Sequence, residues 1–294
     1  MLVAESISLP ALPAALAALA AQYPARSMSP QGAVLSWREA GTLGGQGEQR
    51  DGKPVLVLLH GIGSGSGSWL NQLAALADSH RVIAWDAPGY GLSAPLPADT
   101  PGAADYAAAL ASLLDGLGVQ RLTLVGHSLG ALVACAYAAR HAGKVGRLVL
   151  LNPARGYAHA PPELRRQKLD DRLALMNKLG PREHALQRGP ALLGPHAGDA
   201  ARALVIWNGS QLHPEGYAQA ARMLAAGDLA EDAARYTGPV LVACGSEDRI
   251  TPEKGCRLIA AEFTQAEYRS LPGLGHASYI DSPEQVNTLL LSVP

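Results

Sequence analysis

Short apolar runs that suit buried strands recur along the chain and limit the folds that it can adopt. The clearest is Val55–His60, whose valine and leucine side chains suit a strand covered on both faces. Further strands are expected at Val34–Glu39, Arg81–Trp85, Leu122–Val125, Arg147–Leu151, Val240–Ala243 and Ala266–Leu271. Helix patterns separate most of these runs. The alternation predicts an α/β fold, with a mainly parallel central sheet flanked by helices.

One long stretch, residues 153–237, interrupts this alternation. It is rich in Ala, Leu, Arg and Pro, and only Ala203–Trp207 carries a weak strand signal. Helix patterns lie at Pro162–Leu179, Arg182–Leu193, Asp199–Asn208 and Pro214–Ala226. We therefore expect a helical insertion between two late strands. The core domain would then consist of residues 1–152 and 238–294.

The composition favours a small-molecule substrate. The 294 residues are 48% hydrophobic, which is enough for one large core. Lys and Arg (24) nearly balance Asp and Glu (25), and no basic run is present, so nucleic acid is not an expected partner. The three cysteines, Cys135, Cys244 and Cys256, form no zinc or CxxC pattern. We expect neither a metal nor a cofactor, and the sequence leaves a homo-oligomer open.

The N-terminal segment Leu9–Ala21 is apolar and resembles a signal peptide in part. However, Glu5 precedes it, and Pro10 and Pro13 interrupt it. We interpret Pro13–Tyr23 as an Ala-rich helix and expect a cytoplasmic protein. No stretch is long and apolar enough to predict a bilayer span, so a membrane is not an expected partner.

The strongest chemical signal is Gly126-His-Ser128-Leu-Gly130. This G-x-S-x-G pattern follows a predicted strand and opens a predicted helix, the context in which a serine hydroxyl becomes an exposed nucleophile. A Cβ at either glycine would clash with backbone in so tight a turn. We predict Ser128 as a nucleophile.

A serine nucleophile needs a base and an acid to orient that base, in the chain order Ser, acid, His. Among nine histidines, His276 lies in a Gly-rich loop after the last predicted strand. Asp248 follows strand Val240–Ala243 and is the predicted acid, with Glu247 as its local rival. The alternative acid position, after Arg147–Leu151, holds Asn152, which is not a carboxylate.

Two backbone N–H groups are expected to stabilise an oxyanion. One is that of Leu129, directly after the nucleophile, and the other belongs to the loop after the first buried strand. We assign the second to Ile62, with Gly63 as the alternative. His60 is expected to support this loop structurally.

These residues together resemble the α/β-hydrolase superfamily. The resemblance rests on Leu59–Gly63, Asp86–Ser93, Gly126–Gly130, Gly245–Asp248 and Gly275-His276. It implies that residues 153–237 form a helical cap over the active site and that Asp86–Ser93 is a structural turn. It also implies the Ser128, Asp248 and His276 roles given above.

Within this superfamily, the chain resembles 3-oxoadipate enol-lactonases and carboxylesterases. Haloalkane dehalogenases and epoxide hydrolases of this fold carry Asp where this chain has Ser128. Carbon–carbon bond hydrolases of ring-cleavage pathways typically have Trp after the catalytic His, where this chain has Ala277. The resemblance implies hydrolysis of a small ester or lactone, with carbon–carbon bond hydrolysis as the alternative. A non-catalytic ligand receptor is a third hypothesis, because fold does not fix function.

Two side chains are predicted to contact substrate. Arg155 could hold a substrate carboxylate, since its guanidinium suits two-point recognition, or it could form an ion pair at the root of the insertion. Trp69, with Trp207, could shape an apolar pocket or simply belong to the core.

Overall fold

The computed structural model describes residues 9–41 and 52–292. Within them, eight strands form one sheet in the order β1-β2-β4-β3-β5-β6-β7-β8. The strands are β1 Arg26–Met28, β2 Leu35–Ala40, β3 Val55–Leu59, β4 Arg81–Asp86, β5 Leu122–His127, β6 Val145–Leu151, β7 Val240–Gly245 and β8 Ala266–Leu271. The neighbouring strands from β4 to β8 in this order pair in parallel. At the other edge, β2 pairs antiparallel with β4, and β1 pairs antiparallel with β2. The predicted α/β fold with a mainly parallel sheet is confirmed.

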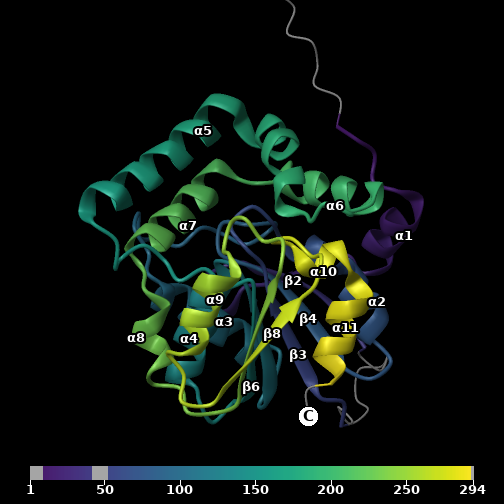
Figure 1. Cartoon of the computed structure of the whole chain (residues 1–294). Helices are drawn as coiled ribbons and strands as arrows, with labels where there is room; N and C mark the ends of the chain where they lie inside the picture. Colours follow the sequence, from purple (N-terminus) through teal and green to yellow (C-terminus); the bar gives the residue numbers. More distant parts are fainter. Residues whose placement is uncertain (1–8, 42–51, 293–294) are drawn as a thin grey trace, which may run out of the picture.

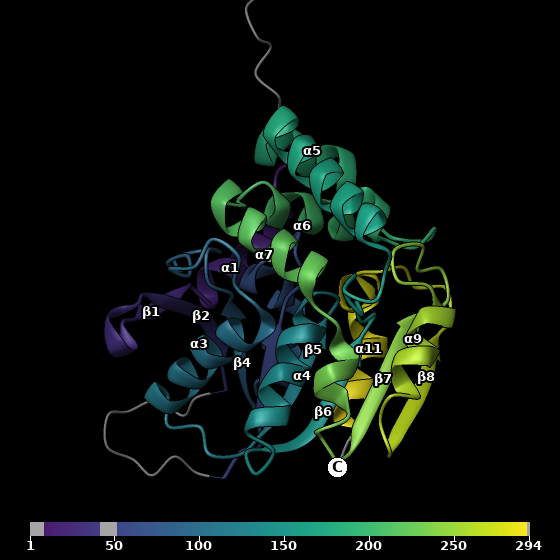
Figure 2. The same cartoon turned by 90° about the vertical axis from the view of Figure 1, so that its left-hand side faces the viewer.

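Strand side chains alternate between two apolar layers. In β3, Val57 and Leu59 belong to one buried cluster, whereas Leu56 and Leu58 belong to the other. The first cluster includes residues of α3 Ala103–Gly116, α4 Gly130–Arg140, α8 Leu229–Ala233 and α9 Glu253–Ala260. The second includes residues of α1 Ala14–Gln22, α2 Leu70–Leu76, α10 Ser278–Asp281 and α11 Pro283–Leu291. The sheet is thus covered on both faces (Figures 1 and 2).

Between β6 and β7 the chain forms only helices in place of sheet. They are α5 Pro162–Arg188, the 3-10 turn η3 Pro190–Leu192, α6 Asp199–Gly209, α7 Pro214–Ala226 and α8. Figure 1 shows α5, α6 and α7 above one end of the sheet, and the second view agrees. Residues 153–237 are called the inserted segment below. The weak strand signal at Ala203–Trp207 belongs to helix α6.

Helix α5 is broken near its end. Gly180 has φ 68° and ψ 170°, a backbone conformation that only glycine adopts readily, and Pro181 follows it. Pro181 has no N–H for an intrahelical bond. The two separate helix patterns predicted on either side of this pair are therefore confirmed.

Glycines bring the backbone of the inserted segment close to the rest of the described chain, for example in α7 and after β8. A Cβ on Gly216 of α7 would lie 2.0 Å from the Gly89 carbonyl oxygen, in the loop after β4. A Cβ on Gly275, after β8, would lie 2.4 Å from the Gly194 nitrogen. Hydrogen bonds reinforce both contacts: Gln219 Nε2 donates to the Leu96 carbonyl, and the Ala277 N–H donates to the Leu192 carbonyl.

No helix among residues 9–41 and 52–292 has the length and apolar character needed to cross a bilayer.

Candidate active site

Ser128 lies at a sharp turn between β5 and α4. Its φ is 52°, in the left-handed region that non-glycine residues rarely occupy. A Cβ on Gly126 would lie 2.6 Å from the Gly130 carbonyl oxygen, and one on Gly130 would lie 2.7 Å from the Leu59 carbonyl oxygen. The prediction that both glycines are required by close backbone approach is confirmed.

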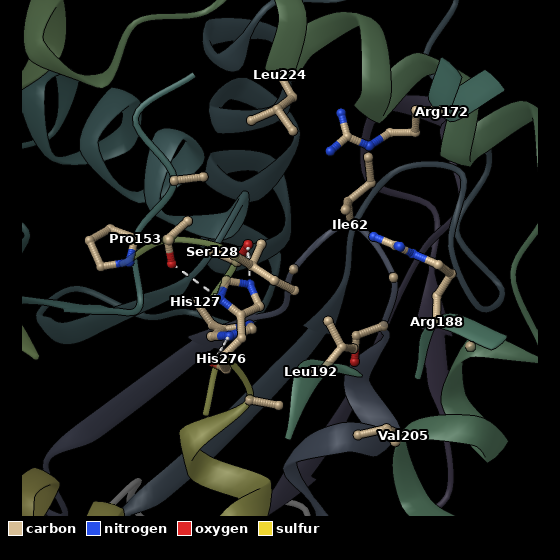
Figure 3. A pocket seen from close by; sticks show the side chains of 18 of the residues that line it. Ile62, His127, Ser128, Pro153, Arg172, Arg188, Leu192, Val205, Leu224 and His276 are labelled. Carbon is tan, nitrogen blue, oxygen red and sulfur yellow. Dashed lines mark hydrogen bonds between the residues drawn. The ribbon is translucent and has the colours of Figure 1, made fainter. Parts of the chain in front are cut away.

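The structure brings the three predicted residues into one hydrogen-bonded chain. Ser128 Oγ lies 2.9 Å from His276 Nε2, and His276 Nδ1 lies 2.9 Å from Asp248 Oδ2. All three follow parallel strands, since Ser128 follows β5, Asp248 follows β7 and His276 follows β8. Because the carboxyl ends of parallel strands meet at one edge of the sheet, residues far apart in sequence converge there. Figure 3 shows Ser128 and His276 side by side.

The Asp248 carboxylate is held by several donors besides His276. The N–H groups of Ile250 and Thr251 donate to Oδ1, while the Thr251 hydroxyl (2.7 Å) and Asn152 Nδ2 (2.8 Å) donate to Oδ2. Burial alone would raise the pKa of this carboxyl. The hydrogen bond and charge of His276, with the bonds from Asn152 and Thr251, hold the pKa well below its usual value. Asp248 is therefore ionised at neutral pH.

Sequence reasoning did not assign roles to Asn152 and Thr251. Asn152 follows β6 at the position considered for an acid, and its amide instead donates to Asp248. The hydroxyl oxygen of Thr251 also lies 3.1 Å from His276 Nδ1. The rival Glu247 is exposed, whereas Asp248 is buried. The sequence did offer a signal for Asn152: an amide directly after β6, the strand beside β7, can reach the acid that follows β7.

The N–H groups of Ile62 and Leu129 have no acceptor among the residues that the structure describes. Their directions are set by neighbouring carbonyls, because N–H and C=O point opposite ways in a trans peptide. The Ser128 carbonyl accepts from the Ala131 and Ala154 N–H groups, which fixes the peptide of Leu129. The Gly61 carbonyl fixes the peptide of Ile62 in the same way.

His60 supports this second peptide. Its Nδ1 lies 2.8 Å from the Gly61 carbonyl oxygen, and its Nε2 accepts from the Ala87 N–H at 3.0 Å. Burial lowers the pKa of His60, so the ring is neutral, as an accepting Nε2 requires. The Tyr90 hydroxyl holds the next carbonyl, that of Ile62, at 2.9 Å. The expected structural role of His60 is confirmed.

His127 lies beneath His276 and does not contact the serine hydroxyl. Its Nε2 donates to the His276 carbonyl at 2.8 Å, and the two ring centroids lie 4.9 Å apart. Burial, and then the neighbouring His276, lower the pKa of His127 to about 3. A neutral ring is therefore packed directly against His276 at neutral pH.

A cavity of about 470 Å³ opens above Ser128, between the sheet edge and the inserted segment. Aliphatic side chains line much of it, among them Ile62, Leu192, Val205 and Leu224 (Figure 3). This volume suits a small organic substrate.

The two predicted substrate contacts, Arg155 and Trp69, are both engaged by other residues of the protein. Arg155 lines the cavity, but its guanidinium is engaged by Asp228 at 3.0 Å and Glu262 at 2.8 Å. This corresponds to the ion-pair alternative at the root of the inserted segment. The prediction that Trp69 shapes the pocket is wrong, because its ring is fully buried and stacks on Tyr279 with centroids 3.8 Å apart. Trp207 lies over Gly67, away from this cavity.

Comparisons with known proteins agree with the fold described above. The family model described as alpha/beta hydrolase fold matches residues 54–283. A relative from Klebsiella pneumoniae (strain 342), which carries the name "Putative carbamate hydrolase RutD", is 32% identical over 246 residues. The match covers 81% of this chain and 90% of the relative.

Solved structures extend the likeness to the whole architecture. A thermophilic esterase from Thermogutta terrifontis has a TM-score of 0.78 and 25% identity, covering 92% of this chain and 97% of the esterase. The enol-lactonase from Burkholderia xenovorans LB400 has a TM-score of 0.72 and 26% identity, covering 91% of this chain and 98% of the lactonase.

Proposed function

Because this chain belongs to the α/β-hydrolase fold family, we propose that it hydrolyses a small carboxylic ester or lactone through an acyl-enzyme on Ser128. The hydrogen-bonded chain Ser128–His276–Asp248 at the floor of the cavity carries this proposal. The likeness to an esterase and an enol-lactonase supports it.

In the first step, Ser128 Oγ attacks the substrate carbonyl while His276 Nε2 takes the hydroxyl proton. The ionised Asp248 accepts from Nδ1 and stabilises the imidazolium that forms. The N–H groups of Ile62 and Leu129 donate to the developing oxyanion. When the tetrahedral intermediate collapses, the carbon–oxygen bond breaks and the imidazolium gives its proton to the leaving alkoxide.

In the second step, His276 takes a proton from water, which attacks the acyl carbonyl. Collapse of the second intermediate releases the carboxylic acid and returns the proton to Ser128 Oγ. A lactone follows the same path, except that its alcohol stays attached to the acyl group. The inserted segment acts as a cap that covers the cavity, and the core domain comprises residues 1–152 and 238–294.

The test combines a chromogenic ester with active-site labelling. Wild-type protein should give a burst with p-nitrophenyl butyrate and be labelled at Ser128 by a fluorophosphonate. Ser128→Ala and His276→Ala should each lose on the order of 10⁶ in turnover. The control is Ser79→Ala, at an exposed serine on the core. Retention of most activity in Ser128→Ala would refute the proposal, and the absence of labelling would favour a ligand receptor.

Carbamate hydrolysis is the second candidate. It is favoured by the relative named "Putative carbamate hydrolase RutD" from Klebsiella pneumoniae (strain 342), which is 32% identical and matches 81% of this chain. The same serine attack applies, with a carbamoyl-enzyme in place of the acyl-enzyme. Release of p-nitrophenol from a p-nitrophenyl carbamate at a higher kcat/KM than from the matched ester would select this candidate. Loss of colour from a ring-cleavage dienoate would select carbon–carbon bond hydrolysis instead.

A further inference from the structure

The cavity above Ser128 has an uneven charge. Among the described residues that line it are three arginines and four histidines, but no Asp or Glu: Arg155, Arg172, Arg188, His127, His159, His184 and His276. Arg155 is neutralised by two carboxylates. The remaining guanidinium groups, those of Arg172 and Arg188, give the wall of the inserted segment a net positive charge.

Both arginines belong to α5, yet they line one cavity because the helix is broken. They are 16 residues apart, and on an unbroken helix their Cα atoms would be separated by about 24 Å along the axis and turned by about 160°. The break at Gly180 lies between them and redirects the last turns of α5. Figure 3 shows both side chains entering the cavity near Ile62.

Neither guanidinium has a carboxylate partner within residues 9–41 and 52–292. Arg172 is half-buried and interacts with the Tyr217 hydroxyl, whereas Arg188 is exposed. Burial, and then the charges of Arg188 and Arg172, lower the pKa of His184, so both cations act on one neighbour. Two adjacent cations without a counter-charge favour an anion between them.

We propose that Arg172 and Arg188 bind a carboxylate of the substrate that is remote from the bond cleaved at Ser128. This inference rests on the proposed function and narrows its substrate class to esters or lactones that carry a free acid. A guanidinium binds a carboxylate through paired hydrogen bonds, which fits this ligand better than a neutral one. The aliphatic wall formed by Ile62, Leu192 and Leu224 suits the methylene chain between the two ends.

The test compares two esters that differ in charge, mono-p-nitrophenyl adipate and p-nitrophenyl hexanoate. Wild-type protein should prefer the anionic ester in kcat/KM. Arg172→Gln should reduce this preference about tenfold, mainly by raising KM for the anionic ester. A factor of about ten corresponds to the loss of one charge-assisted hydrogen bond. Arg188→Gln should reduce it less, because an exposed charge is screened by solvent. The control Arg166→Gln changes an exposed arginine of α5 outside the cavity, and Arg172→Lys should recover part of the preference.

Two results would overturn the inference and leave the proposed function intact. One is equal kcat/KM of the wild type for the two esters, and the other is an unchanged preference for the anionic ester in the double variant Arg172→Gln/Arg188→Gln. Inactivity toward both esters without labelling of Ser128 would overturn the proposed function instead. A readout independent of turnover then still applies, namely calorimetric titration of the Ser128→Ala variant with adipate. Adipate binding weakened by Arg172→Gln supports the inference. Binding that is absent, or weaker than that of inorganic phosphate, refutes a carboxylate site.

Discussion

Replacing His127 with glutamine should change how the stability of the protein depends on pH. Burial, and then the nearby His276, lower the pKa of His127 to about 3, so the folded protein keeps this ring neutral. The unfolded chain instead takes up a proton near the ordinary value of about 6.5. Since the folded pKa is depressed, the stability that it contributes is present above about pH 6.5 and is lost as pH falls toward 3.

The size of the effect follows from this difference. At about pH 5.0, protonation favours the unfolded state by roughly 2 kcal/mol through this one histidine, against almost nothing at about pH 7.5. This free-energy difference hardly depends on the pKa of His127 in the folded protein, as long as that pKa stays well below about 5. Burial also lowers the pKa of His60, which adds a loss of stability of the same sign, so the variant is compared with the wild type.

The assay is reversible urea denaturation at both pH values. The wild type should lose about 2 kcal/mol more than His127→Gln between about pH 7.5 and about pH 5.0. Glutamine keeps an amide donor for the His276 carbonyl. The control His196→Gln alters an exposed histidine and should keep the pH dependence of the wild type. Equal pH dependence in His127→Gln and the wild type would refute the assignment of a neutral buried ring.

Two further substitutions test the supports of the site. Thr251→Val removes the hydroxyl that donates to Asp248 Oδ2 but keeps the backbone donor, so kcat for p-nitrophenyl butyrate should fall about tenfold with little change in KM. Thr251→Ser should restore the rate, and a full rate in the valine variant would show that the hydroxyl is dispensable. Gly130→Ala places a Cβ against the Leu59 and His60 carbonyl oxygens and should lower the free energy of unfolding by about 1–3 kcal/mol in urea. Gly143→Ala, with open space around its Cβ, is the control, and equal stability of the two variants would contradict the argument.

The order of strands made much of the site predictable from sequence. Ser128, Asp248 and His276 each follow a strand whose apolar run is recognisable, and parallel pairing brings the ends of those strands together. The break in α5 was also readable, because Gly180-Pro181 cannot continue a helix. Strand β1 was not predicted, since the three residues Arg26–Met28 carry no apolar pattern.

Other parts of the site depend on tertiary contacts that no local pattern encodes. Trp69 looks the same in sequence whether it faces a cavity or stacks on Tyr279, which is distant in the chain. Arg155 follows β6 at the root of the inserted segment, and the carboxylates that neutralise it, Asp228 and Glu262, lie far from it in the sequence. Most of the α5 surface is polar, so periodicity does not single out the face that bears Arg172.

The two glycine contacts of the inserted segment, Gly89 with Gly216 and Gly194 with Gly275, allow this segment to lie close to the sheet edge that bears Ser128. They follow β4 and β8, on either side of β5, and backbone meets backbone in both, so a residue larger than glycine at these positions would push the inserted segment away from the sheet. Glycine at these positions consequently keeps the inserted segment close to the floor of the cavity. A variant of this chain would gain room for a bulkier substrate from smaller side chains in the cavity, or from a larger residue at one of these glycines, which would move the inserted segment outward.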